Sequence, residues 1–318
     1  MKSFVNLSPS PTRVGRACAW IEQEDGRVLM TGLEWGGWTL PGGGVHPGET
    51  AAQAAVREAW EEAGARCEVA GDPVPLRGAS GVDAECFPLR LLALEPSPEG
   101  RPVAWVNPRS LPWADDVQLR QVLAARGETP QALALPPLVA RAVNSAEAHG
   151  FPHSCSFETG RLLRTLAASR PGGRMLELGS GWGVGTAWLL SGLDTAAGLV
   201  TVDVTPACAE AVASLLAGDP RAEVRCADWR DALTAGPFDL IFVDCAPAKG
   251  EESLDALVDA LRPGGLLVVD DLSPPAFLPE RMHGGDPLRE ALYAQPRLLC
   301  TEVSVSRRES VVLATRTA

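Results

Sequence analysis

The stretch GGVHPGETAAQAAVREAWEEAG, residues 43–64, decides the fold of the first half of the chain, because it carries a complete helix signal. Thr50 followed three residues later by Gln53 is a capping-box pattern, in which each side chain satisfies a backbone N–H of the first turn. The alanines after Thr50 propagate a helix, and Gly64 is a residue type that ends one. The sequence therefore predicts a helix from Thr50 to Gly64.

Acidic side chains gather on one face of this predicted helix. At about 100° per residue, Glu58, Glu61 and Glu62 fall within an arc of roughly 100°. Arg57 lies four residues before Glu61, close enough to orient it. Carboxylates that repel one another are most readily kept together by a cation, and their hard oxygen ligands suit Mg²⁺ or Mn²⁺. A Glu-x-x-Glu-Glu pattern alone would more often be a solvated acidic face, so the rest of the pattern has to decide.

The whole stretch resembles the Nudix box, G-x5-E-x7-R-E-U-x-E-E-x-G-U. It matches at every Gly, Glu and Arg position of that motif: Gly43, Glu49, Arg57, Glu58, Glu61, Glu62 and Gly64. The chain departs from the motif at Ala59 and Ala65, where bulky aliphatic residues are usual, and at His46, where many members carry Glu. The resemblance covers roughly residues 12 to 127.

This resemblance implies a Nudix α/β/α sandwich with a mixed sheet and hydrolysis of a nucleoside diphosphate linked to another group. Glu58, Glu61 and Glu62 would hold Mg²⁺ or Mn²⁺, and one of these carboxylates could also act as base. Arg57 would complete the catalytic set, with Glu49 in support.

The stretch MLELGSGWGVG, residues 175–185, is a strand that runs into a glycine loop and then into a helix. Glycines let the backbone approach a ligand where any Cβ would clash, and the helix start offers free N–H groups. The spacing of Gly179, Gly181 and Gly183 differs from the G-x-G-x-x-G of dinucleotide-binding proteins. Two acids frame the loop, Glu177 on the strand before it and Asp203 at the end of the next strand.

This arrangement is similar to class I S-adenosylmethionine-dependent methyltransferases, and the resemblance spans about residues 155 to 318. It implies that the loop cradles S-adenosylmethionine, that Glu177 lies near the amino-acid part, and that Asp203 takes the ribose hydroxyls. Asp228 matches the acidic position near the adenine, although a solvated loop Asp is nearly as good an interpretation. The domain resembles O-methyltransferases most, and the sequence does not identify the methyl acceptor.

Three further aspartates follow apolar strands of the second half. Metal-dependent O-methyltransferases that resemble this domain carry acids at the positions of Asp244, Asp270 and Asp271, which would meet at the carboxyl edge of a parallel sheet. They could hold Mg²⁺, which would orient an acceptor hydroxyl, and Lys249 could take the proton. In the other interpretation, Asp270 and Asp271 simply cap the following loop.

The composition narrows the classes of protein that are possible. With 46% hydrophobic and 21% charged residues, the 318-residue chain has the mix of a soluble globular protein and is long enough for two domains. A formal net charge of −12 makes a nucleic-acid partner unlikely. No apolar run is long enough to span a membrane, and the start does not resemble a secretory signal, so we expect a cytoplasmic protein. Cys and His are scattered without zinc-site spacing.

The chain changes pattern near Gly127. Before it, short strand-like runs surround one alanine-rich helix. After it, strands and helices alternate, which predicts a Rossmann-like, doubly wound parallel sheet that ends in an antiparallel hairpin. We therefore expect two domains of the α/β class, residues 1–127 and 128–318.

The leading hypothesis is a bifunctional enzyme with Mg²⁺ (or Mn²⁺) and S-adenosylmethionine as cofactors. It would act on a nucleotide-type small molecule and on a methyl acceptor that the sequence does not identify. Two alternatives stay open. The second domain could be a catalytically silent cofactor-binding sensor, or the first could bind nucleotides without cleaving them. The sequence leaves the oligomeric state undetermined.

Overall fold

The computed structural model describes residues 15–33, 37–77, 83–110, 113, 116–130, 133–274, 277, 278, 282, 284–306 and 309–318. The chain divides into two compact units, Met1–Ala134 and Leu135–Ala318. The boundary lies a few residues after the Gly127 position expected from the sequence. Within the described part, no helix is both long enough and apolar enough to cross a membrane.

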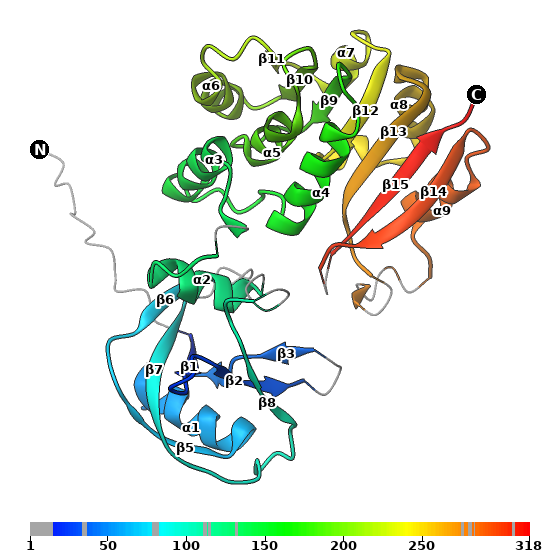
Figure 1. Cartoon of the computed structure of the whole chain (residues 1–318). Coiled ribbons are helices and arrows are strands. Elements are labelled where there is room, and N and C mark those ends of the chain that lie inside the picture. Colours follow the sequence, from blue (N-terminus) through cyan, green and yellow to red (C-terminus); the bar gives the residue numbers. More distant parts are fainter. Residues whose placement is uncertain are drawn as a thin grey trace, which may run out of the picture. The chain divides into compact units, whose positions relative to one another are not determined.

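Two sheets and two helices build the first unit (Figure 1). Its strands are β1 (Arg16–Ile21), β2 (Val28–Gly32), β3 (Trp38–Thr39), β4 (Gly42–Gly44), β5 (Ala65–Val69), β6 (Val74–Arg77), β7 (Asp83–Leu94) and β8 (Val103–Val106), and its helices are α1 (Ala51–Ala63) and α2 (Val117–Ala125). One sheet has the order β4-β1-β7-β5, with β6 also paired to β7, and the other has the order β3-β2-β8. Since β1 runs parallel to β7 and antiparallel to β4, the larger sheet is mixed.

Alternation along β1 sends successive side chains to two different cores. Ala19 packs with the alanines of α1, whereas Trp20 packs with the leucines of α2. A helix thus covers each side of the strands, which confirms the predicted α/β/α sandwich. Ala59 and Ala65, the departures from the bulky aliphatic pattern, are fully buried in the α1 core.

Helix α1 begins and ends as its sequence predicts. Both hydrogen bonds of the capping box between Thr50 and Gln53 are present. Gly64 terminates the helix in the left-handed region, with φ 66°, and donates its N–H to the carbonyls of Ala59 and Trp60. The sequence also predicts a strand from Val14 to Ile21; β1 covers it from Arg16 on, and Val14 lies outside the described residues.

One seven-stranded sheet with helices on both faces builds the second unit (Figure 1). Its strands are β9 (Arg174–Leu178), β10 (Gly198–Asp203), β11 (Ala222–Cys226), β12 (Phe238–Val243), β13 (Leu261–Leu272), β14 (Leu298–Ser304) and β15 (Ser310–Arg316). Its helices are α3 (Pro137–Ala148), α4 (Phe157–Ala168), α5 (Val184–Gly192), α6 (Pro206–Leu215), α7 (Trp229–Leu233), α8 (Leu254–Ala260) and α9 (Pro287–Ala294), with short 3₁₀ turns η3 (Ala246–Ala248) and η4 (Glu251–Ser253).

The strand order of the sheet is β11-β10-β9-β12-β13-β15-β14. The chain adds β10 and β11 on one side of β9 and then crosses over to add β12 and β13 on the other side. The pairs from β11 to β13 are parallel, and β15 and β14 add an antiparallel hairpin. This confirms the predicted Rossmann-like sheet and terminal hairpin. Arg307 and Arg308, which the sequence places between the two predicted strands of the hairpin, lie outside the described residues.

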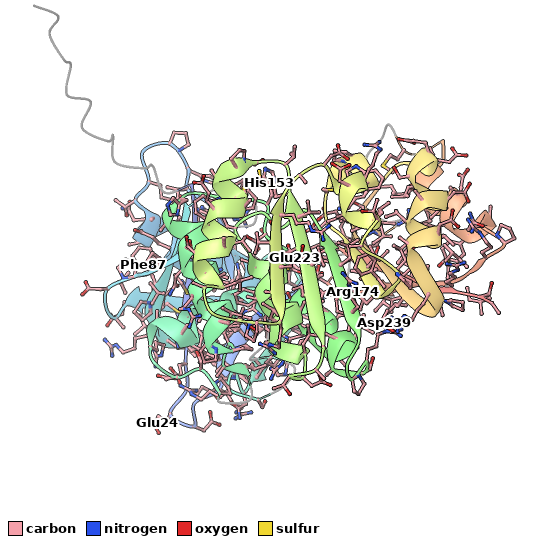
Figure 2. All side chains as sticks on the ribbon, turned by 90° about the horizontal axis from the view of Figure 1, so that it is seen from above. Glu24, Phe87, His153, Arg174, Glu223 and Asp239 are labelled. Atoms are coloured by element: carbon pink, nitrogen blue, oxygen red, sulfur yellow. The ribbon has the colours of Figure 1, made fainter. Side chains whose placement is uncertain are left out.

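Side chains of the parallel strands alternate between two cores, as expected for strands buried on both faces. Met175 packs toward α3 to α6, and Leu176 packs toward α7 to α9. The amino ends of the strands are marked by Arg174, whose backbone N–H donates to Asp239 Oδ2 at 2.7 Å (Figure 2). The opposite, carboxyl edge carries the glycine loop and the aspartates.

Candidate functional site

Arg57 is the centre of the acidic cluster on α1. Its guanidinium donates to Glu49 through Nε and Nη2, at 2.9 and 3.1 Å. Its Nη1 donates to Glu58 Oε1 and to Glu61 Oε2, each at 2.8 Å. A further bond runs from Nη2 to the carbonyl of Gly44 at 2.9 Å. One side chain therefore fixes three carboxylates and the β4 backbone relative to one another.

Glu49 and Glu58 lie in different surroundings within this cluster. The hydrogen bonds from Arg57, joined by the N–H of His46, lower the pKa of Glu49 to about 2. Glu58 is buried at 8% exposure and lies directly against Gly43, where a Cβ would collide with its carboxylate. Gly43 is therefore required for close packing between β4 and α1.

Glu62 points to a different set of partners. Its Oε2 accepts the N–H of Gly42 at 2.9 Å, and its Oε1 pairs with Arg101 Nη1 at 2.7 Å. Burial raises the pKa of Glu62 against the opposing influence of these two partners. Sequence analysis missed Arg101, because a single Arg in the loop between β7 and β8 carries no motif.

The three glutamates of α1 are assembled around β4 but do not all bring ligand atoms within 4.8 Å of one another. Arg57 holds Glu58 and Glu61 together, and Arg101 holds Glu62. The donor set of hard carboxylate oxygens suits Mg²⁺ or Mn²⁺, and the neighbouring guanidiniums show that the cluster already attracts positive charge. The residues present fit a divalent cation.

The glycine loop of the second unit depends on backbone conformations that other residues rarely adopt. Gly179, Gly181 and Gly183 have φ values of 96°, 48° and 84°. A Cβ on Gly179 would lie 2.7 Å from the carbonyl oxygen of Asp244. The glycine loop therefore packs directly against the backbone that follows β12, and Gly179 has no room for a side chain there.

A cavity of about 290 Å³ opens beside this loop at the carboxyl edge of the sheet. Its lining combines the loop with the ends of β10 and β12 and the start of α7: Gly179, Val202, Asp203, Val204, Ala227, Asp228, Trp229, Cys245 and Pro247. Three residues predicted to bind the cofactor, Gly179, Asp203 and Asp228, thus line it. Gly181 and Gly183 shape the loop without lining the cavity. Trp229, Cys245 and Pro247 were not foreseen, since each lies outside the motif.

Asp203 and Asp228 hold the rim of the cavity. Asp203 accepts the N–H of Gly181 at 2.9 Å and that of Thr205 at 2.8 Å, so its carboxylate joins the glycine loop to the turn after β10. Asp228 caps α7 by accepting the N–H of Arg230 at 2.9 Å. Both carboxylates stay partly accessible to a ligand.

Glu177 lies behind the loop and does not line the cavity. Its side chain is fully buried, and its Oε2 accepts from the hydroxyls of Thr186 and Thr201, the latter at 2.6 Å. Its Oε1 has no hydrogen-bond partner among the described residues. Burial raises the pKa of Glu177 to about 7. The carboxylate therefore ties β9 to α5 and β10 from within the core.

This burial makes stability depend on pH. The Glu177 carboxyl titrates near 4.5 in an unfolded chain and near 7 in the fold, so folding favours its protonated form. The contribution of Glu177 to the free energy of unfolding is therefore complete below about pH 4.5. It is lost as pH rises through about 7, by about 3 kcal/mol. In calorimetric unfolding of the full chain, the Glu177→Gln variant should lose less stability than the wild type over that range.

A matched control is Glu223→Gln, because Glu223 is an exposed residue of β11 that pairs with Arg225. It should follow the wild-type pH dependence. Parallel curves for the wild type and Glu177→Gln would contradict the prediction.

The predicted aspartates after β12 and β13 come together in the structure. Among the described residues, Asp244, Asp270 and Asp271 form the one group of three acidic, histidine or cysteine side chains with ligand atoms all within 4.8 Å. Lys249 Nζ lies 2.5 Å from Asp271 Oδ2 and 3.7 Å from Asp244 Oδ1. Thr159 donates to Asp270 Oδ1 at 3.3 Å, a contact from α4 that no sequence signal indicated.

Burial opposes charge on two of these aspartates. It raises the pKa of Asp244 to about 9 and that of Asp270 to about 6. The nearby Lys249 partly offsets the penalty for Asp244. Clustered carboxyls in a desolvated position are suited to a divalent cation, which would replace protons. The residues present therefore fit Mg²⁺.

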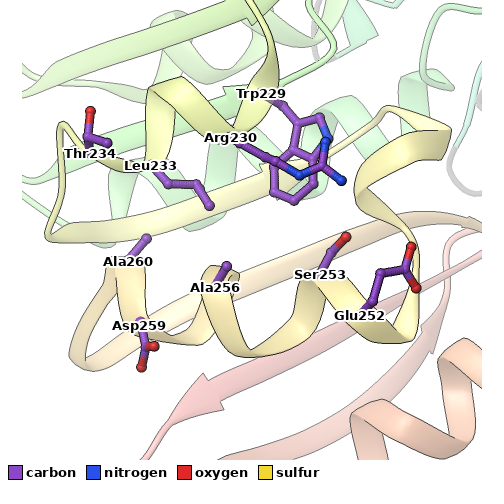
Figure 3. A pocket seen from close by; sticks show the side chains of 9 residues that line it. All are labelled: Trp229, Arg230, Leu233, Thr234, Glu252, Ser253, Ala256, Asp259 and Ala260. Carbon is purple, nitrogen blue, oxygen red and sulfur yellow. The ribbon is translucent and has the colours of Figure 1, made fainter.

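A second cavity of about 500 Å³ lies between α7 and the η4–α8 segment (Figure 3). Trp229 lines this cavity as well as the cofactor-side one. The guanidinium of Arg230 stacks on the Trp229 ring, with Cζ 4.4 Å from the ring centroid. Among the described residues, the lining of this cavity contains no three-residue metal-ligand group.

Comparison with known families gives a result for each half. Residues 11–125 match the NUDIX domain model, and residues 176–272 match a methyltransferase domain model. These matches confirm both resemblances stated from the motifs.

Two relatives that match the second half of the chain carry the name O-methyltransferase. A catechol O-methyltransferase of Mycobacterium tuberculosis is 31% identical over 143 residues, which is 43% of this chain and 65% of that protein. A Mycolicibacterium vanbaalenii protein provisionally named an O-methyltransferase is 34% identical over 117 residues, 35% of this chain and 52% of that protein. The match therefore spans about half to two thirds of the length of these relatives.

A solved structure shows the same fold. The O-methyltransferase from Bacillus cereus in complex with SAH aligns with a TM-score of 0.53 and 22% identity, over 63% of this chain and 97% of that one. At this identity the likeness establishes the fold alone.

Proposed function

Because the chain carries a NUDIX domain followed by a methyltransferase domain, we propose that it is a bifunctional enzyme. The first domain hydrolyses a nucleoside diphosphate derivative, and the second transfers a methyl group from S-adenosylmethionine to an oxygen of a small molecule. The observation that carries this proposal is the presence of two complete acidic sites, one around Arg57 and one around Lys249. We place the domains at residues 1–127 and 128–318; the two compact units of the structure divide a few residues later, after Ala134.

In the first domain, Glu58, Glu61 and Glu62 would hold the divalent cation. When bound there, it would supply the charge that neutralises a diphosphate and lowers the pKa of water. Arg57 keeps Glu58 and Glu61 in position. Glu61, the most exposed of the three side chains at 39%, is best placed to accept the proton of the attacking water.

In the second domain, the glycine loop and Asp203 bind S-adenosylmethionine, with Asp203 accepting from the ribose hydroxyls and Asp228 at the adenine end. Glu177 positions the loop from behind. Asp244, Asp270 and Asp271 would hold Mg²⁺, which would supply the charge that orients the acceptor hydroxyl and lowers its pKa. Lys249 Nζ receives or steers the acceptor proton. Homology to a catechol O-methyltransferase supports oxygen as the acceptor atom.

The first test is ligand selectivity. Calorimetric titration of the full chain should show binding of S-adenosylmethionine and of its demethylated product, and none of NAD. The spacing of Gly179, Gly181 and Gly183 disfavours a dinucleotide. Asp203→Ala should weaken cofactor binding by about tenfold or more, since it removes acceptors for two hydroxyls.

The matched control is Asp239→Asn, at the opposite edge of the same sheet, where Asp239 pairs with Arg262 at 3.0 Å. It should bind the cofactor as the wild type does. Binding of NAD in place of S-adenosylmethionine would refute the assignment. Cofactor binding without methyl transfer in a broad acceptor screen would favour a silent sensor domain.

A further inference from the structure

Arg101 reaches the acidic cluster of the first domain from outside the α1 motif. It follows the turn between β7 and β8, and its Nη1 lies 2.7 Å from Glu62 Oε1. Its Nε lies 2.7 Å from Glu99 Oε2. The side chain keeps 24% of its surface exposed. Arg101 is therefore bound to a proposed cation ligand while remaining open to solvent.

The loop that carries Arg101 is fastened to α1 itself. The carbonyl of Glu61 accepts the hydroxyl of Ser97 at 3.0 Å and the N–H of Glu99 at 3.2 Å. The N–H of Glu95 also bonds to the carbonyl of Gly64 at 2.9 Å. These backbone bonds hold Arg101 next to the glutamates independently of its ion pair with Glu62.

Arg101 already occupies the Glu62 oxygen that the backbone leaves open. The Oε2 of Glu62 accepts the Gly42 N–H, and its Oε1 faces Arg101. A divalent cation that takes Oε1 would stand beside the guanidinium, and like charges at such a distance repel strongly in a partly buried site. The cation and Arg101 therefore compete for Glu62.

An arginine displaced from Glu62 still has its anchored loop and its Glu99 partner. A diphosphate that arrives with the cation offers non-bridging oxygens close by, and a planar guanidinium binds such oxygens in a two-pronged manner. Arg57 cannot fill this role, because Glu49, Glu58, Glu61 and the Gly44 carbonyl already engage it.

We propose that Arg101 is a diphosphate-binding residue that changes partners. It neutralises Glu62 in the free protein, and it donates to the diphosphate of the substrate once a divalent cation has taken Glu62. This inference rests on the proposed hydrolase function and adds the residue that couples cation loading to substrate binding.

The experiment measures two affinities in the full chain, that of Mn²⁺ alone and that of a methylene-bridged nucleoside diphosphate in the presence of Mn²⁺. Arg101→Gln should bind Mn²⁺ about threefold more tightly or better, because a competing charge is gone. It should bind the methylene-bridged diphosphate about tenfold or more weakly, because a charged hydrogen-bond donor is lost. Arg101→Lys should bind Mn²⁺ about as tightly as the wild type does. Its affinity for the methylene-bridged diphosphate should lie between that of the wild type and that of Arg101→Gln.

Arg66→Gln is the matched control, since Arg66 pairs at 2.6 Å with Glu95 in an exposed position of the same domain. Both of its affinities should equal those of the wild type. Weaker Mn²⁺ binding in Arg101→Gln would overturn the proposal and make Arg101 a support for Glu62. Unchanged diphosphate binding in Arg101→Gln would also overturn the proposal. If Arg101→Gln does not fold, unchanged diphosphate binding in Arg101→Lys would do the same. Failure of the wild type to bind Mn²⁺ at all would instead refute the hydrolase function, and the partner change with it.

Discussion

Replacement of Glu61 by Gln should reduce diphosphate hydrolysis by about a thousandfold, equivalent to ~4 kcal/mol of activation free energy. The substitution keeps the shape of the side chain and removes its charge. Arg57 Nη1 retains its bond to Glu58 at 2.8 Å, so the rest of the cluster stays in place. Glu61 is 39% exposed on its side chain, and the fold should therefore tolerate the change. Release of phosphate or nucleotide from the best substrate, measured with Mg²⁺, gives the result.

The matched control for this prediction is Glu68→Gln. Glu68 lies on β5, outside the motif, and pairs with Arg90 in an exposed position. Its substitution should leave turnover unchanged. Normal turnover in Glu61→Gln, with Glu68→Gln also normal, would show that this face of α1 does not perform the chemistry.

Methyl transfer should fall by about a hundredfold or more in Asp244→Asn, because the variant loses one of three carboxylates that hold the cation. Asp244 does not line the cofactor cavity, so binding of S-adenosylmethionine should be retained. Excess EDTA should reduce the activity of the wild type by a similar factor. Transfer of labelled methyl to an identified acceptor, with a parallel calorimetric titration of the cofactor, measures both quantities.

A control for the loss of charge alone is Asp239→Asn at the far edge of the sheet, which should keep full activity. Methyl transfer that continues undiminished in EDTA would rule out the cation. In that case Asp244 would act only through its contact with Lys249.

Many of the features that the sequence predicted in the two sites are local in the chain; the meeting of Asp244 with Asp270 and Asp271 is an exception, which follows from the shared edge of a parallel sheet. The capping box of α1, its stop at Gly64 and the pairing of Arg57 with Glu61 all depend on residues within one helix. A helix fixes the relative positions of such residues by its geometry alone. The same reasoning applies to the glycine loop, where the strand, the loop and the next helix are consecutive.

The parts that escaped prediction depend on distant segments. Arg101 meets Glu62 because a loop folds back onto α1, and Thr159 meets Asp270 because α4 packs near the end of β13. Strand β11 was missed because it is an edge strand, whose polar Glu223 and Arg225 break the apolar run expected of a buried strand. No single-sequence pattern encodes these tertiary contacts.

Lys249 shows that distance along the chain is a poor guide to distance in space. The sequence places it five residues after Asp244, with Pro247 between them. The structure winds Ala246–Ala248 into the 3₁₀ turn η3, which shortens this path and returns Lys249 Nζ to within 3.7 Å of Asp244 Oδ1. Sequence distance overstated the separation because the intervening residues are coiled.

Gly43 leaves the proposed hydrolase site little freedom to change over evolutionary time. The contact between this glycine and Glu58 means that any side chain at position 43 would push a carboxylate out of the cluster. A lineage can therefore lose the activity through a change that touches no acidic residue. A related chain that keeps counterparts of Glu58, Glu61 and Glu62 would therefore be expected to keep the activity only if it also has glycine at the position of Gly43.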